Sequence, residues 1–504
     1  MTMSKVLFAT TAITLLSRLL SLFSLQIYMA FFGPQNIEIN IFSYALNIPN
    51  IIFNVVGTLI AAVVVPIYTG LLSTDKEQSQ IFIKNIITFV CLVVVVLIGV
   101  GFVGAPFLAN ITAYRDYPFM VYALRVKVFA MFFYGLHYVF QGILHSHGKF
   151  LLPAFVTIPT SVVVISYVLF FGHDHGVFGL VYAMVFGLSL QAFLLLPAVI
   201  KLGLRYRPAL DFNNPHIRQA LMLSVPLLLS TVSFQINSIF NNTLATGFNL
   251  VLVMGFVQNL VLVLILSIVH PVMNVYLPRL SGLWASGKKD EFKISLENAI
   301  LLIMFFLIPA SVGFFLLQFE IINLLVTWGQ FTTEDARLTA GLLGLYGLGV
   351  VSIGLKEIMD RGFYSQKNSK IPGFVGLFIM ITNITFSLTF VNTLGAATMP
   401  ISFIVSTSLG SLFLIVVLHK KIGIISKRII AHILSFSVSA GLMGFVLYQT
   451  QYFFDSIVFA TEIATRSIRL FAPVALGLVV YLVCTAILSI LLAFVKTAPK
   501  NPAS

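Results

Sequence analysis

Long apolar runs separated by short polar breaks recur along the chain from Val6 to Val495. A run of about 18 or more apolar residues is long enough to cross the roughly 30 Å hydrocarbon core of a bilayer as a helix. Fourteen such runs can be delimited, so the pattern predicts an all-α integral membrane protein with about fourteen transmembrane helices. The predicted spans are 6–31, 39–72, 81–109, 119–146, 150–171, 176–200, 217–243, 248–277, 293–318, 338–363, 371–392, 396–418, 428–450 and 466–495.

Two loop motifs recur six spans apart. Residues 66–76, after the second span, and 278–288, after the eighth, share Pro, Gly and Lys at the same spacing. The loop 142–153, after the fourth span, is similar to 362–372, after the tenth. Because six is an even number, such a repeat keeps its orientation in the membrane. We therefore expect two parallel six-helix lobes around a central cavity, followed by two extra C-terminal helices.

The predicted domain division follows from this repeat and from the longest basic connector, Lys201 to Arg218, which contains two prolines. Two interpretations of the connector stay open: a topogenic linker that contacts anionic lipid, or a dedicated site for a substrate phosphate. The predicted parts are a first lobe at 1–205, a basic cytoplasmic linker at 206–216, a second lobe at 217–422 and the two extra helices at 423–504.

Composition and charge agree with a membrane protein. Of the 504 residues 59% are hydrophobic and 9% are charged, whereas soluble domains have about 45 to 50% apolar and about 25% charged residues. If the N-terminus is cytoplasmic, the only Lys or Arg residues in the outer loops are Arg115, Arg337, Arg466 and Arg469. The other Lys and Arg residues of the loops then lie on the cytoplasmic side, as expected for cytoplasmic loops. Both termini are therefore predicted to be cytoplasmic. The net charge of +13 is attributed to topology and to contact with membrane lipids, and no nucleic-acid partner is expected.

Four spans have polar residues at helical spacing, which marks either helix packing or a water-filled cavity. These spans occupy equivalent places in the two repeats, so we predict that they line one substrate-binding cavity. The alternative for any single residue is that it only joins two helices. The stripes are Thr10, Thr14, Ser17, Ser21 and Ser24 with Arg18 beside them; Ser43, Asn47, Asn50, Asn54 and Thr58; Thr231, Gln235, Ser238 and Asn242 with Asn237 and Asn241 beside them; and Asn259, Ser267, His270 and Asn274.

Charged residues inside the spans carry further expectations. A cation near mid-span costs at least about 2.5 to 3.5 kcal/mol unless it reaches water or an anion, so Arg18 is predicted to contact an anion in the cavity. Its alternative is a buried partner to a carbonyl or an Asn. Residues 356–361 contain two pairs of opposite charge four residues apart, which favours an ion-pair cluster over a proton relay. Arg125 and Lys127 are expected to extend toward the membrane surface.

Signatures of soluble enzymes are missing from the sequence. It contains no P-loop. His173 and His175, and His145 and His147, lie in short loops without the further ligands of a zinc site. We therefore expect a transporter without catalytic residues, cofactor or bound metal.

Several motifs together resemble the lipid II flippase family, MurJ or MviN, of the MOP exporter superfamily. The resemblance covers nearly the whole chain. For the fold, it implies two six-helix lobes around a V-shaped cavity and a lipid-tail groove formed by the two extra helices. For the function, it implies alternating access that moves lipid II, an undecaprenyl-pyrophosphate-linked glycan, outward across the bacterial cytoplasmic (inner) membrane. This step serves cell-wall biogenesis. The motifs are 16–20 (LSRLL), 47–50 (NIPN), 142–150 (GILHSHGKF) with 153–154, 277–281 (LPRLS), 331–340 (FTTEDARLTA) and 361–365 (RGFYS).

The chain departs from the family pattern in its charges. Family members typically have further cavity arginines near the positions of Ser24, Asn54 and Asn259, so Arg18 is the one cavity arginine that carries over. Pyrophosphate is usually bound by several Arg or Lys donors. Three functions therefore stay open: a lipid II flippase, an exporter of another polyprenyl-linked oligosaccharide, or a scaffold for cell-wall synthesis that does not transport.

The sequence says less about the energy source of transport and about the oligomeric state. Gln235, Asn237 and Asn383 are the candidate residues for an ion site, although carboxylates are missing from these spans. Coupling to a sodium ion, a proton or the membrane potential therefore stays open, and we expect a monomer.

Overall fold

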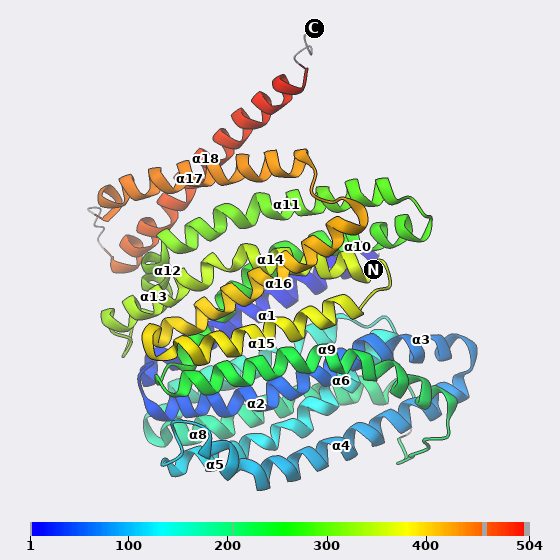
Figure 1. Ribbon diagram of the computed structural model, residues 1–504. Coiled ribbons are helices and arrows are strands. Elements are labelled where there is room, and N and C mark those ends of the chain that lie inside the picture. The colour runs from blue at the N-terminus through cyan, green and yellow to red at the C-terminus, as the bar shows by residue number, and fades with distance from the viewer. Residues whose placement is uncertain (1–2, 205, 456–460, 498–504) are drawn as a thin grey trace. The chain divides into compact units, whose positions relative to one another are not determined.

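The computed structural model describes residues 3–204, 206–455 and 461–497, and most of these residues are helical (Figure 1). The chain divides into two compact units. Unit 1 comprises Met1–Phe256 with Trp328–Phe331, and unit 2 comprises Val257–Thr327 with Thr332–Ser504. The helices of unit 1 are α1 (Met3–Phe32), α2 (Ile37–Leu59), the π-helical turn η1 (Ile60–Val64), α3 (Val65–Thr74), α4 (Lys76–Asn110), α5 (Pro118–Val128), α6 (Ala130–Ser146), α7 (Leu151–Phe155), α8 (Ile158–Ile200) and α9 (Pro215–Thr246).

Helix α10 (Val251–Ala285) starts in unit 1 and continues into unit 2. The remaining elements belong to unit 2. They are α11 (Lys289–Leu316), α12 (Gln318–Val326), α13 (Thr333–Leu348), α14 (Val350–Tyr364), α15 (Lys370–Leu394), the 3-10 turn η2 (Gly395–Ala397), α16 (Thr398–Ile422), α17 (Lys427–Asp455) and α18 (Glu462–Thr497).

The prediction of an all-α membrane protein is confirmed. In the described part of the chain, eleven helical segments are long and apolar enough to span a membrane. Two of these segments, Leu151–Ile200 and Lys370–Ile422, each contain two of the predicted spans, and α9 corresponds to a further one. With the two segments counted as pairs and α9 added, the described helices account for the fourteen predicted spans.

Helix α8 is a hairpin of two spans. Gly176 interrupts it with a φ of 55°, a backbone conformation that glycine adopts readily. The Tyr167 hydroxyl donates to the Gly176 carbonyl at 2.7 Å, and the Thr160 hydroxyl donates to the Gly187 carbonyl at 2.7 Å. The chain therefore folds back on itself at the break between predicted spans 150–171 and 176–200.

Helix starts are encoded by local capping residues. Asn36, Asp75 and Asn214 precede α2, α4 and α9, and each side chain accepts hydrogen bonds from the first backbone N–H groups of its helix. Thr332 and Asp335 form a capping box at the start of α13. These caps satisfy N–H groups that a helix cannot pair internally.

The boundaries of the compact units differ from the predicted lobes. Helix α9 packs against α2 and α4 and belongs to unit 1, although the repeat assigns it to the lobe 217–422. The contact between α2 and α9 includes the Tyr44 hydroxyl, 3.0 Å from the Thr243 hydroxyl. The lobe boundaries, which rest on the repeat, stay a prediction.

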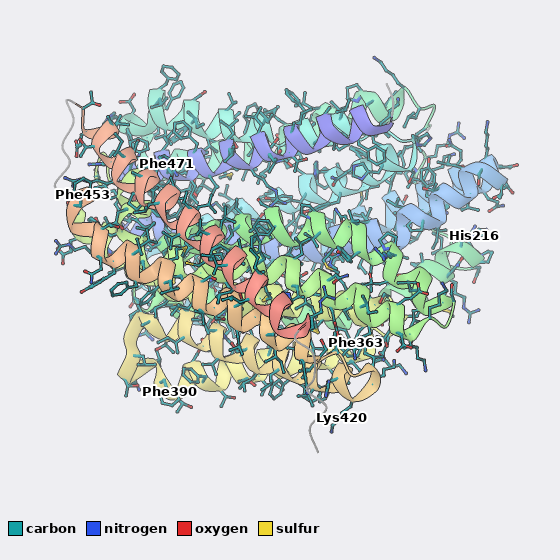
Figure 2. The ribbon with its side chains drawn as sticks, turned by 90° about the horizontal axis from the view of Figure 1, so that it is seen from above. His216, Phe363, Phe390, Lys420, Phe453 and Phe471 are labelled. Atoms are coloured by element: carbon teal, nitrogen blue, oxygen red, sulfur yellow. The ribbon has the colours of Figure 1, made fainter. Side chains whose placement is uncertain are left out.

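The two C-terminal helices pack on α11 within unit 2. Helix α17 packs against both α11 and α18, and the Tyr481 hydroxyl of α18 donates to the Phe305 carbonyl of α11 at 2.8 Å. Figure 2 shows Phe390, Phe453 and Phe471 at one end of unit 2 and Lys420 at the other end. This placement agrees with helices that run alternately up and down.

Lys127 corrects one sequence expectation. Its side chain is 1% exposed, and its Nζ donates to the Phe42 carbonyl of α2 at 2.5 Å. The ammonium also lies 3.1 Å from the centroid of the Phe42 ring. The expectation that Lys127 extends toward the membrane surface was wrong, because α5 packs on α2 and directs this side chain into the helix interface.

Gly187 provides a test of the hairpin. A Cβ atom at this position would lie 3.1 Å from the Thr160 Cα atom, so a leucine would force the two halves of α8 apart. We expect Gly187→Leu to lower the free energy of unfolding by about 1 to 3 kcal/mol, measured as a lower melting temperature in detergent. Gly99→Leu in α4 is the control, because no atom lies within 4 Å of its Cβ position. Equal melting temperatures for the two variants would contradict the close packing.

Candidate functional site

A polar pocket of about 580 Å³ lies within unit 1 between α2, η1, α3, α6 and α9. Its volume lies in the range of small-molecule binding sites, about 300 to 1,000 Å³. Hydroxyl, amide and imidazole groups supply its polar surface, and the lining that the structure describes has neither Lys nor Arg. The polar lining residues are Asn54, Thr58, Tyr138, Gln141, His145, Thr231 and Gln235.

Two glycines let α6 approach the other side of the pocket closely. A Cβ atom at Gly57 would lie 2.6 Å from the Tyr138 ring, and one at Gly142 would lie 2.7 Å from the Ile60 side chain. The pocket wall also contains the π-helical turn η1, in which the Val65 N–H bonds to the Ile60 carbonyl five residues earlier. Pro66 follows this turn and cannot donate to the carbonyl four residues before it, which favours the wider helical turn.

The polar stripe of α2 has several different partners. The Asn47 amide donates to Asn242 Oδ1 of α9 at 2.9 Å, and Asn50 Oδ1 accepts a short hydrogen bond from the Tyr134 hydroxyl of α6. Asn54, one turn further, lines the polar pocket. One predicted stripe therefore both joins helices and contributes to the pocket.

Helix α9 contributes the opposite wall. Gln235, which the sequence predicts as a site residue, lines the pocket together with Thr231. Asn242 is turned to α2, where it receives the bond from Asn47 and donates to its own helix at Ser238. The structure thus brings Asn54 and Gln235 to one pocket, and it uses Asn47 and Asn242 as the bridge beside it.

The polar stripe of α1 packs against neighbouring helices. The Ser17 hydroxyl donates to the Ala154 carbonyl at 3.1 Å, and Ser21 lies 3.2 Å from the Ser161 hydroxyl of α8. Ser24 is buried. Arg18 lies on the exposed side of α1 and is not part of the polar pocket lining. A cavity role for these four residues stays a prediction.

Sequence reasoning missed the contribution of α6. Tyr138, Gln141 and His145 are spaced three and four residues apart and reach the pocket from one face of this helix. The same spacing rule that revealed the other stripes could have found them. Their signal was weak because an aromatic residue starts the stripe and His145 was assigned to the following loop.

Two predicted site residues belong to unit 2. Asn259 is exposed and His270 is half-buried, and both lie on α10. Their membership of a cavity shared with unit 1 stays a prediction.

The candidate coupling residues are divided between the two units. Asn383 is fully buried, and its amide donates to the Ser402 hydroxyl at 3.1 Å, which also accepts from Ser387 at 2.9 Å. Its Oδ1 atom is buried and has no hydrogen-bond donor among the described residues. Gln235 and Asn237 lie on α9 in unit 1. The Oδ1 atom of Asn237 is also buried, and the part of the chain that the structure describes supplies no donor to it.

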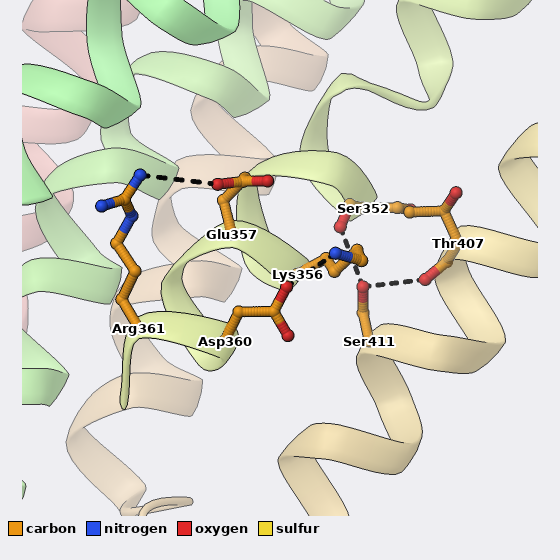
Figure 3. Close-up of polar contacts among 7 residues, drawn as sticks. All are labelled: Ser352, Lys356, Glu357, Asp360, Arg361, Thr407 and Ser411. Carbon is orange, nitrogen blue, oxygen red and sulfur yellow. Dashed lines mark hydrogen bonds and ion pairs between the residues drawn. The ribbon is translucent and has the colours of Figure 1, made fainter. Parts of the chain in front are cut away.

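The predicted ion-pair cluster is confirmed in unit 2 (Figure 3). Lys356 Nζ lies 2.6 Å from Asp360 Oδ2, and Arg361 Nη2 lies 3.9 Å from Glu357 Oε2. The Ser411 hydroxyl of α16 donates to the Ser352 carbonyl at 2.9 Å and fixes α14 beside α16. The charges therefore pair along α14 itself, as the spacing of four residues predicts.

Comparison with known proteins identifies the family. The family model described as "Lipid II flippase MurJ" matches residues 29–495. The chain belongs to the MurJ family of lipid II flippases. A relative from Borreliella burgdorferi, described as "Probable lipid II flippase MurJ", is 24% identical over 500 residues and covers 95% of each chain. The resemblance noted from the sequence motifs is therefore confirmed, and the protein is a multi-pass membrane transporter rather than an enzyme.

Solved structures show the same fold. The structure "Lipid II flippase MurJ, inward closed conformation" aligns with a TM-score of 0.78 and 21% identity, over 95% of this chain and 98% of that chain. An inward-facing multidrug resistance transporter of the MATE family and MOP superfamily aligns with a TM-score of 0.69 and 15% identity, over 82% of this chain and 98% of that chain. The MurJ-family chain therefore has the fold of the MOP superfamily.

The ion pair of α14 yields a prediction. Asp360→Leu leaves the Lys356 ammonium without its partner, and we expect it to lower the free energy of unfolding by up to about 3 kcal/mol. The double variant Lys356→Met/Asp360→Leu should recover most of this loss, measured by thermal unfolding in detergent, and should still flip lipid II. Loss of flipping in a stable double variant would support the proton relay instead.

An exposed pair on α11 serves as the control for this experiment. Lys288 Nζ and Glu291 Oε1 are 2.8 Å apart, and both side chains are 56% exposed. Because water screens exposed pairs, Glu291→Leu should change the free energy of unfolding by less than about 1 kcal/mol.

Proposed function

We propose that this MurJ-family flippase moves lipid II from the inner to the outer leaflet by alternating access, and that the polar pocket of unit 1 binds part of its headgroup. The observation that supports this proposal is the meeting of Asn54, Gln141 and Gln235 from three helices in one pocket. Lipid does not select for amides inside a membrane, so three of them around one pocket favour a polar ligand.

The chemistry of the pocket suits sugar and peptide groups. Each Asn or Gln side chain offers two N–H donors and one acceptor oxygen, and the Tyr and Thr hydroxyls both donate and accept. Sugar hydroxyls and peptide amides have the matching mixture of donors and acceptors. Neutral hydrogen bonds contribute only about 0.5 to 1.5 kcal/mol each, which suits a transporter that must release its cargo on the other side.

The diphosphate requires a different contact. The described lining of the polar pocket has no Arg or Lys, and Arg18 is the one family cavity arginine that this chain retains. We place the diphosphate near Arg18 in a stage of transport at which α1 borders the headgroup. Binding then depends on one guanidinium and several neutral donors.

We also propose that the chain lies in the bacterial cytoplasmic membrane with both termini in the cytoplasm. The support is the distribution of Lys and Arg among the loops, with Arg115, Arg337, Arg466 and Arg469 as the only outer basic residues of the loops. The headgroup then enters from the side on which lipid II is made.

Site variants test the binding role. Gln235→Leu and Asn54→Leu each remove hydrogen bonds to the headgroup and should weaken lipid II binding about threefold to tenfold while the melting temperature changes little. Binding is measured with purified protein in detergent. Ser189→Ala is the control, because its buried hydroxyl donates to the Phe186 carbonyl of its own helix and does not line the pocket, and binding should be unchanged. Unchanged binding in both leucine variants would contradict the assignment of the pocket.

Complementation tests the activity itself. The chain is expressed in a bacterium depleted of its own flippase, and externally exposed lipid II is measured. Rescue by the wild type, and a smaller rescue by Gln235→Leu at equal membrane levels, is the expected result. Failure of a correctly inserted wild type would favour a scaffold that does not transport.

We propose that the membrane potential drives transport. A diphosphate with about two negative charges, compensated by Arg18 alone, leaves a net negative cargo, and an interior-negative potential favours its outward movement by about 2.3 kcal/mol per charge per 100 mV. The return of empty Arg18 inward is favoured by the same field. Fewer cavity arginines leave more negative charge on the loaded carrier, so more of the driving force acts on the outward step, whereas the charge moved over a whole cycle equals that of the cargo.

Proteoliposomes separate this coupling from an ion gradient. Collapsing the potential at constant sodium should slow net flipping severalfold, and replacing sodium by potassium at a constant potential should have no effect. Flipping driven by a sodium gradient at zero potential would instead assign coupling to the Asn383 cluster, and Asn383→Leu would then abolish the sodium dependence.

A further inference from the structure

A second pocket in unit 1 is almost entirely apolar. It has a volume of about 490 Å³ and lies between α2, α4 and α9 of unit 1, where α9 packs against both α2 and α4 (Figure 1). Aliphatic and aromatic side chains from all three helices line it, among them Val55, Leu59, Phe89, Val93 and Ile236. Such a surface gains from contact with hydrocarbon and offers almost nothing to a polar ligand.

The apolar pocket adjoins the polar pocket. Ile60 and Gln235 line both of them. Helices α2 and α9 run antiparallel, with Asn47 bonded to Asn242, so the same register brings Asn54 opposite Gln235. Beyond the Asn47 bridge, the α2–α9 pair therefore has a polar pocket on the side of α6 and an apolar pocket on the side of α4.

The connector between α8 and α9 covers one end of the apolar pocket. The Ala209 N–H donates to the Thr88 hydroxyl at 3.1 Å, and the Asp211 N–H donates to Asn85 Oδ1 at 2.5 Å, so the connector is bound to α4. Leu210, Asp211 and Phe212 all line the pocket. At this end a ligand meets a segment fixed by backbone hydrogen bonds.

The charge of the pocket lining favours one of two possible ligands, the acyl chain of a membrane phospholipid or the polyprenyl chain of lipid II. Asp211 is the only charged residue in the described lining of the apolar pocket. The headgroup of an anionic phospholipid entering at the connector would be repelled by this carboxylate. Gln235, which lines both pockets, is neutral, so a chain whose head lies in the polar pocket meets no like charge on that side.

We propose that, in a stage before the diphosphate reaches Arg18, the apolar pocket binds the part of the polyprenyl chain next to the diphosphate while the headgroup occupies the polar pocket. This inference rests on the proposed function and adds a chain-binding site to it. It differs from the expected lipid-tail groove of α17 and α18, because its lining comes from α2, α4, α9 and the connector. Head and chain would thus be held on the two sides of one helix pair.

The first experiment fills the pocket. Val93→Trp places a large side chain into the pocket from α4. The control is Val96→Trp on the same helix, where the native side chain is 55% exposed and does not line the pocket. Binding is measured for full-length lipid II and for a soluble analogue in which a methyl group replaces the polyprenyl chain. Val93→Trp should weaken binding of full-length lipid II about tenfold, since a few buried methylenes suffice for this factor, and leave the analogue unchanged. Val96→Trp should change neither.

Several outcomes would overturn the proposal. If Val93→Trp weakens both ligands equally, the tryptophan disturbs the head site; if it weakens neither, the chain does not lie in this pocket. The proposed function fails separately, when the wild type does not bind the soluble analogue or when Gln235→Leu leaves its binding unchanged.

Photo-crosslinking gives a measurement that does not depend on a bulky substitution. A benzophenone amino acid at Val93 should crosslink to lipid II, and the head-only analogue should reduce this crosslink by competing for the head site. Crosslinking to phosphatidylglycerol that resists competition by lipid II would assign the pocket to a membrane lipid and refute the proposal.

Discussion

Hydrocarbon offers no hydrogen bonds to a protein, and this constraint governs the structure of the chain. Backbone N–H and C=O groups must therefore pair within each spanning segment, which makes helices the only form available to a chain without a closed barrel. Side chains obey the same constraint: the Ser43 hydroxyl bonds to the Ile39 carbonyl of its own helix, and Thr58 does the same with Asn54. Polar groups that cannot be satisfied locally must find another helix or water.

Helix α2 shows how one polar stripe is divided by this requirement. Asn47 bonds to the Asn242 amide of α9, and Asn50 bonds to the Tyr134 hydroxyl of α6. Two neighbouring turns of α2 are therefore bonded to two different helices. One turn later Asn54 lines a pocket instead, and Gly57 and the π-helical segment at 60–64 continue the pocket wall beyond it. The bonds at Asn47 and Asn50 hold the helices whose next turns surround the pocket.

The proposed headgroup site needs few cavity charges. On that proposal, neutral donors bind sugars and peptides weakly enough for release, and a single arginine leaves the cargo with a net charge on which a membrane potential acts. The charged residues of α14 pair with each other. Similarity in fold to a drug transporter of the MATE family indicates that the scaffold accepts different ligands, and the residues of the site decide which ligand is bound.

The sequence by itself determined the helical class, the number of spans, the family and the residue types of the stripes, because apolar run length and helical spacing are local properties. It also predicted the α14 ion pairs, which are four residues apart on one helix. It did not reveal that Ser17 and Ser21 are turned to α7 and α8, that Lys127 is buried against Phe42, or that α6 contributes Tyr138 and Gln141. Only the tertiary structure decides such contacts, because a polar side chain in a span has the same local pattern whether its partner is a neighbouring helix or a ligand.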